Sequence, residues 1–224
     1  MRIVSLVPSL TLTLFDLGLD ATSIVGRTPW CIHPAEQVSD VPVVGGTKTP
    51  TLSKIKGAQP DLVVMDRDEN PKSVHDWCVA HGLPTFVCDV RHPRDVPLML
   101  RELGQAVNRS EAAEVHARAI EAMLRRAPDT NGRTALPLIW HRPLMAANGT
   151  TYAGNMLACL GFNVPNIEPD GTGYPEVSPE IILQHGVTDV FLSSEPHEFT
   201  DEESRSLSEA FGNLRTCLDI FGSF

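Results

Sequence analysis

The side chains best suited to bind a small molecule lie in two short loops that follow predicted strands. The motif GRTPWCIHP brings Trp30 and His33 into one loop, and the motif WHRP places Trp140 and Arg142 in another. An indole offers a large flat face to a ring system, and a neutral imidazole ligates a metal or donates a hydrogen bond. Two indoles on opposite sides of a cleft would clamp a flat ligand. The alternative is that Trp30 packs against its own loop.

Three further positions in the first half are weaker candidates. Ser9 follows Pro8 at a predicted helix start, where backbone amides attract an anionic or carbonyl group, although a plain helix cap also explains it. Thr47 lies in VVGGTKTP, whose paired glycines allow either close approach of the backbone to a ligand or a simple turn. Glu69 lies in DRDEN, which either brings carboxylates to a binding edge or begins a solvated helix.

The second half adds Tyr174 in TGYPEV and both Glu195 and His197 in SSEPHEF. Ligands of α/β proteins bind beyond the carboxyl ends of the strands, where these loops are expected. Ordinary loop packing is the alternative for each of these residues.

One combination of residues resembles a set of zinc ligands. Cys31 and His33 could join His75 and Cys78, which are spaced three residues apart on a predicted helix. The spacing CxH with HxxC is not a recognised zinc pattern, so we expect no metal site and place Cys78 in the core.

Catalytic signatures are absent from the sequence, which contains no GxGxxG after a strand, no GxxxxGK followed by Ser or Thr, no HExxH and no GxSxG. We therefore expect a binding protein with no catalytic residues and no required cofactor. The rival hypothesis is a metal-dependent hydrolase or transferase that uses His33, Glu69 and His197.

Composition limits the class of protein. The chain has 224 residues and a formal net charge of −10, from 28 acidic against 18 basic residues. Nucleic acid and anionic membranes are unlikely partners for such a surface, since no excess of cations can replace their counterions. The five cysteines are an odd number, lie far apart and form no disulfide framework, so we expect free thiols.

The elements that must position these loops alternate between short apolar strands and helical segments, which is typical of an α/β fold with largely parallel sheets. The pattern predicts one α/β lobe over residues 1–107, a connecting helix over 108–128 and a second lobe over 129–224. Ser110 is expected to cap the connecting helix, which would span about 25 Å and could cross between the lobes.

Several motifs together resemble the substrate-binding proteins of ABC transporters that have a helical backbone and bind cobalamin or siderophores. These motifs are MRIVSLVPSLT, VGRTPWCIHP, VPVVGGTKTP, AQPDLVVMDRDEN, IWHRPLMAANGTTYAGNMLACLG and YPEVSPEIILQHGVTDVFLSSEPHEF. They follow the same order over nearly the whole chain, and they are most similar to the cobalamin-binding branch.

The resemblance implies two Rossmann-like lobes joined by one long helix, with a corrinoid, a haem or a ferric siderophore held between them. It also implies delivery to an ABC transporter permease. Ligand contacts carry over to Trp30, His33, Thr47, Glu69, Trp140, Arg142, Tyr174, Glu195 and His197.

Two features depart from the family pattern. The sequence stops near LDIFGSF, so we expect the second lobe to lack its closing helix. The first residues, MRIVSLVPS, already read as a strand and a turn without a signal peptide, and the chain has no apolar run of about 18 residues that would span a bilayer. We therefore expect a cytoplasmic protein, or a periplasmic one if a leader has been removed.

Overall fold

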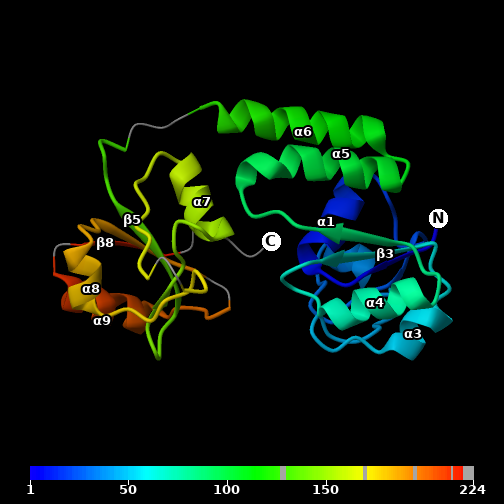
Figure 1. Cartoon of the computed structure of the whole chain (residues 1–224), viewed down its shortest axis with the longest axis horizontal. Helices are drawn as coiled ribbons and strands as arrows, with labels where there is room; N and C mark the ends of the chain where they lie inside the picture. Colours follow the sequence, from blue (N-terminus) through cyan, green and yellow to red (C-terminus); the bar gives the residue numbers. More distant parts are fainter. Residues whose placement is uncertain (127–129, 169–170, 194–195, 213, 219–224) are drawn as a thin grey trace. The chain divides into compact units, whose positions relative to one another are not determined.

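Two compact α/β units make up the computed structural model, which describes residues 1–126, 130–168, 171–193, 196–212 and 214–218 (Figure 1). The first unit contains Met1–Asp89 and Val96–Ile120, and the second contains Val90–Asp95 and Glu121–Phe224. The short segment Val90–Asp95 thus belongs to the second unit although helical residues of the first unit follow it.

The first unit is built on a four-stranded parallel sheet in the order β2-β1-β3-β4. Its strands are β1 (Ile3–Ser5), β2 (Ile24–Gly26), β3 (Leu62–Asp66) and β4 (Thr85–Cys88). Its helices are α1 (Pro8–Asp16), α2 (Ala35–Val38), α3 (Leu52–Gly57), α4 (Lys72–Ala80), α5 (Val96–Ala106) and most of α6 (Ser110–Leu124). Strands β1 and β3 are buried in the interior of the unit, which explains their unbroken runs of Val, Ile and Leu.

The second unit has a sheet in the order β6-β5-β7-β8. Strands β5 (Ala135–Trp140), β7 (Asp189–Leu192) and β8 (Arg215–Leu218) are parallel, whereas β6 (Met145–Ala146) pairs antiparallel with β5. The remaining elements are the 3₁₀ turn η1 (Pro93–Asp95) and helices α7 (Tyr152–Cys159), α8 (Pro179–Gln184) and α9 (Asp201–Phe211). Leu136, Leu138, Ile182 and Val190 are among its fully buried core residues.

The predicted fold class is confirmed, because both sheets are dominated by parallel pairs and carry helices. The sequence analysis missed α2 and β6. These elements have four and two residues, too few to show a period. No helix in the described part of the chain is both long enough and apolar enough to cross a membrane.

The expected cap at Ser110 is wrong by one residue. Ser110 is the first residue of α6, and the carbonyl of Arg109 accepts the bond from the amide of Ala113. Asn108 supplies the left-handed conformation of the turn, with φ 56°. A Cβ at Gly104 would meet that of Ala113 at 2.3 Å, so glycine at this position lets α5 and α6 approach closely beside the turn.

Candidate ligand-binding site

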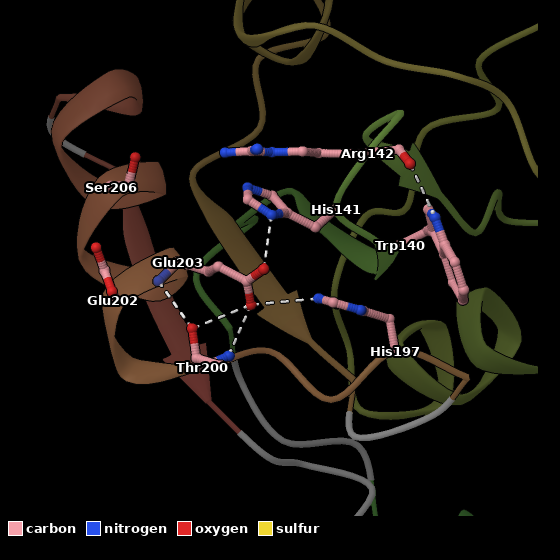
Figure 2. Close-up of a pocket in the computed structure, with 8 residues that line it drawn as sticks. All are labelled: Trp140, His141, Arg142, His197, Thr200, Glu202, Glu203 and Ser206. Atoms are coloured by element: carbon pink, nitrogen blue, oxygen red, sulfur yellow. Dashed lines mark hydrogen bonds and ion pairs between the residues drawn. The ribbon is translucent and has the colours of Figure 1, made fainter.

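A pocket of about 540 Å³ opens in the second unit (Figure 2). It is lined by Trp140, His141, Arg142, His197, Thr200, Glu202, Glu203 and Ser206. Three of these residues were predicted to contact ligand, and they come from loops that follow β5 and β7. The prediction that the carboxyl ends of parallel strands collect the candidate residues therefore holds for this unit.

Three elements supply the polar side chains of the pocket. His141 follows the last residue of β5 directly, and His197 lies between β7 and α9. Glu203 stands in the first turn of α9, where it forms a capping box with Thr200. In this arrangement the Thr200 hydroxyl accepts a bond from the amide of Glu203 and the Glu203 carboxylate accepts one from the amide of Thr200, so the carboxylate is fixed in direction.

The Glu203 carboxylate lies between the two imidazole rings and contacts both (Figure 2). Its Oε1 is 2.7 Å from His141 Nδ1, and its Oε2 is 3.2 Å from His197 Nε2. The side chains of His141, His197 and Glu203 are 16%, 27% and 21% exposed, so solvent reaches all three. Phe199 packs edge-on against both rings and completes the apolar support beneath them.

The hydrogen bond from the Thr200 amide is the main reason why the pKa of Glu203 falls from 4.5 to about 2. Partial burial opposes this shift, whereas His197, the Thr200 hydroxyl and His141 all lower the pKa further. Glu203 is therefore ionised throughout the neutral range and gives the pocket a fixed negative charge.

Trp140 presents an indole at the edge of the same pocket. The indole N–H donates to the carbonyl of Arg142 at 3.1 Å, and the ring lies 5.5 Å from that of His197. Trp140 remains 39% exposed, so part of its face is open to a ligand. The exposed Arg142 side chain adds a cation to the same lining.

In the first unit, Trp30 is exposed rather than packed against its loop. The indole is 65% exposed, and the neighbouring Ile32 is exposed as well, which excludes the packing alternative. Arg27 holds this loop by donating to the carbonyls of Thr28, Val38, Val41 and Cys31. His33 is half-buried in the same loop.

Of two other candidates in the first unit, Thr47 has a structural role that the contacts show. Ser9 does not cap α1, because Val7 occupies the cap position and no side chain bonds there. The VVGGTKTP motif requires glycine because of contacts within the chain rather than because of a ligand. A Cβ at Gly45, where φ is 117°, would meet the amide nitrogen of Thr51 at 2.7 Å. Thr47 contributes its carbonyl, which accepts a bond from the buried Asn70 amide.

The pocket lining includes none of the remaining candidates that the structure describes. Glu69 is exposed in the turn after β3, where its amide donates to the carboxylate of Asp66. Tyr174 is exposed, but the pocket lining does not include it. Glu195 lies outside the residues that the structure describes.

Sequence reasoning missed His141, Thr200 and Glu203. Two signals could have found them. His141 lies between two chosen residues in the WHRP motif, and Thr200 with Glu203 has the Thr-x-x-Glu spacing of a capping box.

The four residues considered above as zinc ligands, Cys31, His33, His75 and Cys78, do not form a metal-capable group in the described part of the chain. Cys31 and Cys78 are buried, and burial raises the pKa of the Cys78 thiol. Within the described ranges, the metal-capable group of His, Cys, Asp and Glu side chains is His141, His197 and Glu203. That group contains His197 but not His33 or Glu69, the other two members of the rival catalytic set, which lie in the first unit.

Two α/β units with mainly parallel sheets, and a pocket beyond the strand ends, define the class of a two-unit α/β binding protein. Residues 3–209 match the model of the periplasmic binding protein family. The match covers most of the chain, so the chain belongs to this family.

Known relatives agree with this assignment. The chain is 22% identical over 210 residues to the vitamin B12-binding protein of Pectobacterium carotovorum, covering 91% of this chain and 75% of that protein. The periplasmic vitamin B12-binding protein BtuF of Vibrio cholerae has a similar structure, with TM-score 0.76, 16% identity, and coverage of 97% and 86%. The periplasmic haem-binding protein HutB of Vibrio cholerae gives TM-score 0.79, 15% identity, and coverage of 96% and 89%.

Proposed function

We propose that this ABC-type substrate-binding protein takes a corrinoid or a related metal chelate, such as haem or a ferric siderophore, and releases it unchanged. Relatives named for vitamin B12 and structural neighbours named for haem support this ligand class. The observation that carries the proposal is the pocket in the second unit, where a partly exposed indole stands beside a guanidinium and two imidazoles.

Each group in the pocket suits one part of such a ligand. The face of Trp140 accepts a macrocycle, and stacking on that face buries apolar surface of both rings. Arg142 suits the polar or anionic groups that extend from the rim of a macrocycle. Trp30, exposed in the first unit, is proposed as a second apolar contact.

The partners follow from the family. A binding protein of this kind delivers its ligand to the permease of an ABC transporter, and the family favours a periplasmic place of action. The proposal includes no chemical step, so recovered ligand should have the mass of the ligand supplied.

Isothermal titration of the purified chain with cyanocobalamin, cobinamide, haemin and a ferric hydroxamate tests the proposal. One of these ligands should bind with one-to-one stoichiometry. Trp140→Ala should weaken that binding about tenfold, or about 1.4 kcal/mol, and Trp30→Ala should also weaken it.

Leu98→Ala is the matched control, because Leu98 is an exposed apolar residue of α5 and not a candidate contact. It should leave the affinity unchanged. Failure of all four ligands to bind, or equal binding by both tryptophan variants and the parent, would refute the proposal.

A further inference from the structure

The cluster of His141, His197 and Glu203 has the donor set of a metal site. Each side chain offers one ligand atom, and these atoms all lie within 4.8 Å of one another. Two imidazoles with one carboxylate are a common set of protein ligands for zinc, and they leave a fourth position for water or another ligand. The three residues come from the end of β5, the loop after β7 and the start of α9.

Two of the three distances between ligand atoms can be compared with those that a bound ion requires, and the third, between the two imidazoles, is within 4.8 Å. Ligand atoms about 2.05 Å from a tetrahedral ion lie about 3.3 Å from one another. The His197 and Glu203 atoms are already 3.2 Å apart, and the His141 and Glu203 atoms are 2.7 Å apart. Small side-chain rotations would therefore admit an ion between atoms that now face one another.

The surroundings of Glu203 resemble the outer shell of a metal site. A ligating carboxylate is usually held by further hydrogen bonds, which fix its direction before the ion arrives. Here the amide of Thr200 donates to Glu203 Oε2 at 2.8 Å, and the Thr200 hydroxyl lies 3.1 Å from the same oxygen. The capping box thus fixes the carboxylate in advance, without help from a metal.

Access and charge also suit a cation. The three side chains are partly exposed at the open pocket, so an ion can enter from solvent without unfolding the unit. Arg142 and Glu202 in the lining have opposite formal charges. Glu203 adds a further carboxylate to the lining, and a carboxylate attracts a cation.

We propose that His141, His197 and Glu203 bind one divalent first-row transition ion of the zinc type. The ion binds to the free chain and requires no organic ligand. This site shares His141 and His197 with the pocket proposed above for the corrinoid or chelate, but binding of Zn²⁺ alone is measured separately from binding of that ligand. Either proposal can therefore fail while the other stands.

Titration of the full chain with Zn²⁺ alone tests this proposal, after chelator treatment and under reducing conditions. The parent should bind one ion per chain. His141→Ala and His197→Ala should each weaken binding at least tenfold. Glu203→Gln should do the same without loss of the helix start, because glutamine at this position still supports a capping box.

His75→Ala is the matched control. His75 also contacts a carboxylate, that of Asp76 at 3.4 Å, but this pair in the first unit lacks a third ligand. The control should bind Zn²⁺ as the parent does, and circular dichroism should show that all variants fold.

Co²⁺ gives a second readout, because its visible spectrum reports both the geometry and the presence of sulfur ligands. A tetrahedral spectrum without thiolate charge-transfer bands is expected. The proposal is overturned if the parent binds no Zn²⁺, if the three site variants bind it as the parent does, or if the Co²⁺ spectrum shows thiolate ligation.

Discussion

The two units place similar strand-end loops in similar positions but use their polar side chains differently. In the first unit, Thr11, Cys31 and Asn70 are buried and bond to neighbouring loops and to one another. In the second unit, His141 and His197 remain partly exposed and converge on one carboxylate.

The difference shows that fold alone does not create a polar site. In the first unit, polar groups at the strand ends form hydrogen bonds with buried backbone groups and so stabilise the loops. Apolar residues such as Trp30 are exposed to solvent there. Where they converge beside an open pocket, they are free to bind a ligand. Four substitutions test this difference between the two units, and they follow in order of decreasing expected effect.

Asp189→Ala should destabilise the second unit by about 3 kcal/mol, because removal of one partner leaves a buried ion pair broken. Asp189 is fully buried in β7 and accepts hydrogen bonds from Arg133 and Thr188. Burial acts to raise the pKa of this carboxyl, but the bonds from Arg133 and Thr188 outweigh it and the pKa is lowered.

Urea unfolding followed by hydrogen exchange would measure this loss and assign it to peptides of β5 and β7. Asp76→Ala is the control, because Asp76 pairs with Lys72 on an exposed helix face and its loss should change stability far less. Equal losses from the two variants would show that burial does not set the cost.

Asn70→Ala should destabilise the first unit by about 2 kcal/mol, because it leaves buried backbone groups without partners. The Asn70 side chain donates to the carbonyls of Thr47 and Leu6 and accepts from the amide of Asp66. Hydrogen exchange should increase in the loops after β1 and β3. Zn²⁺ affinity should stay unchanged, and a loss of Zn²⁺ binding would contradict the division of roles.

Thr11→Val should cost about 1 kcal/mol, since it keeps the shape of the side chain but removes one buried hydroxyl. That hydroxyl lies 2.9 Å from the carbonyl of Val7 and 3.0 Å from Cys31 Sγ. The loss is measured by urea unfolding. A faster reaction of Cys31 with a thiol reagent should accompany it, and unchanged stability would show that the network is not structural.

Glu114→Gln should have the smallest effect, and one that depends on pH. Hydrogen bonds from Arg101 and then Arg118 lower the pKa of Glu114 from 4.5 to about 2. A lowered folded-state pKa stabilises the fold above about pH 4.5, and this contribution is lost as the pH falls toward 2. The melting temperature of the variant should therefore lie below that of the parent at neutral pH, and the gap should close in acid. A constant gap would contradict the assignment.

The fold was largely predictable because its signals are local. The buried apolar runs of β5 and β7 and the helical period of α9 are written directly in the sequence, and such runs produce the alternation from which two α/β lobes were predicted. Elements as short as Ala35–Val38 could not be found in that way.

The site was only partly predictable. Trp140, Arg142 and His197 were found because loops after parallel strands collect at one edge. The exposure of Trp30 could not be derived, since it depends on how Arg27 holds its loop.

The sequence by itself determined that this is an α/β protein of two units with aromatic and histidine-bearing loops at its strand ends. Only the tertiary structure decided that His141, His197 and Glu203 meet. They are separated by 56 and 6 residues along the chain, and the parallel pairing of β5 with β7 brings the first two together. The capping box of α9 then turns the carboxylate toward both rings. The capping box has a local sequence pattern, but the register of β5 against β7 does not, because it depends on pairing between segments that are far apart in the chain.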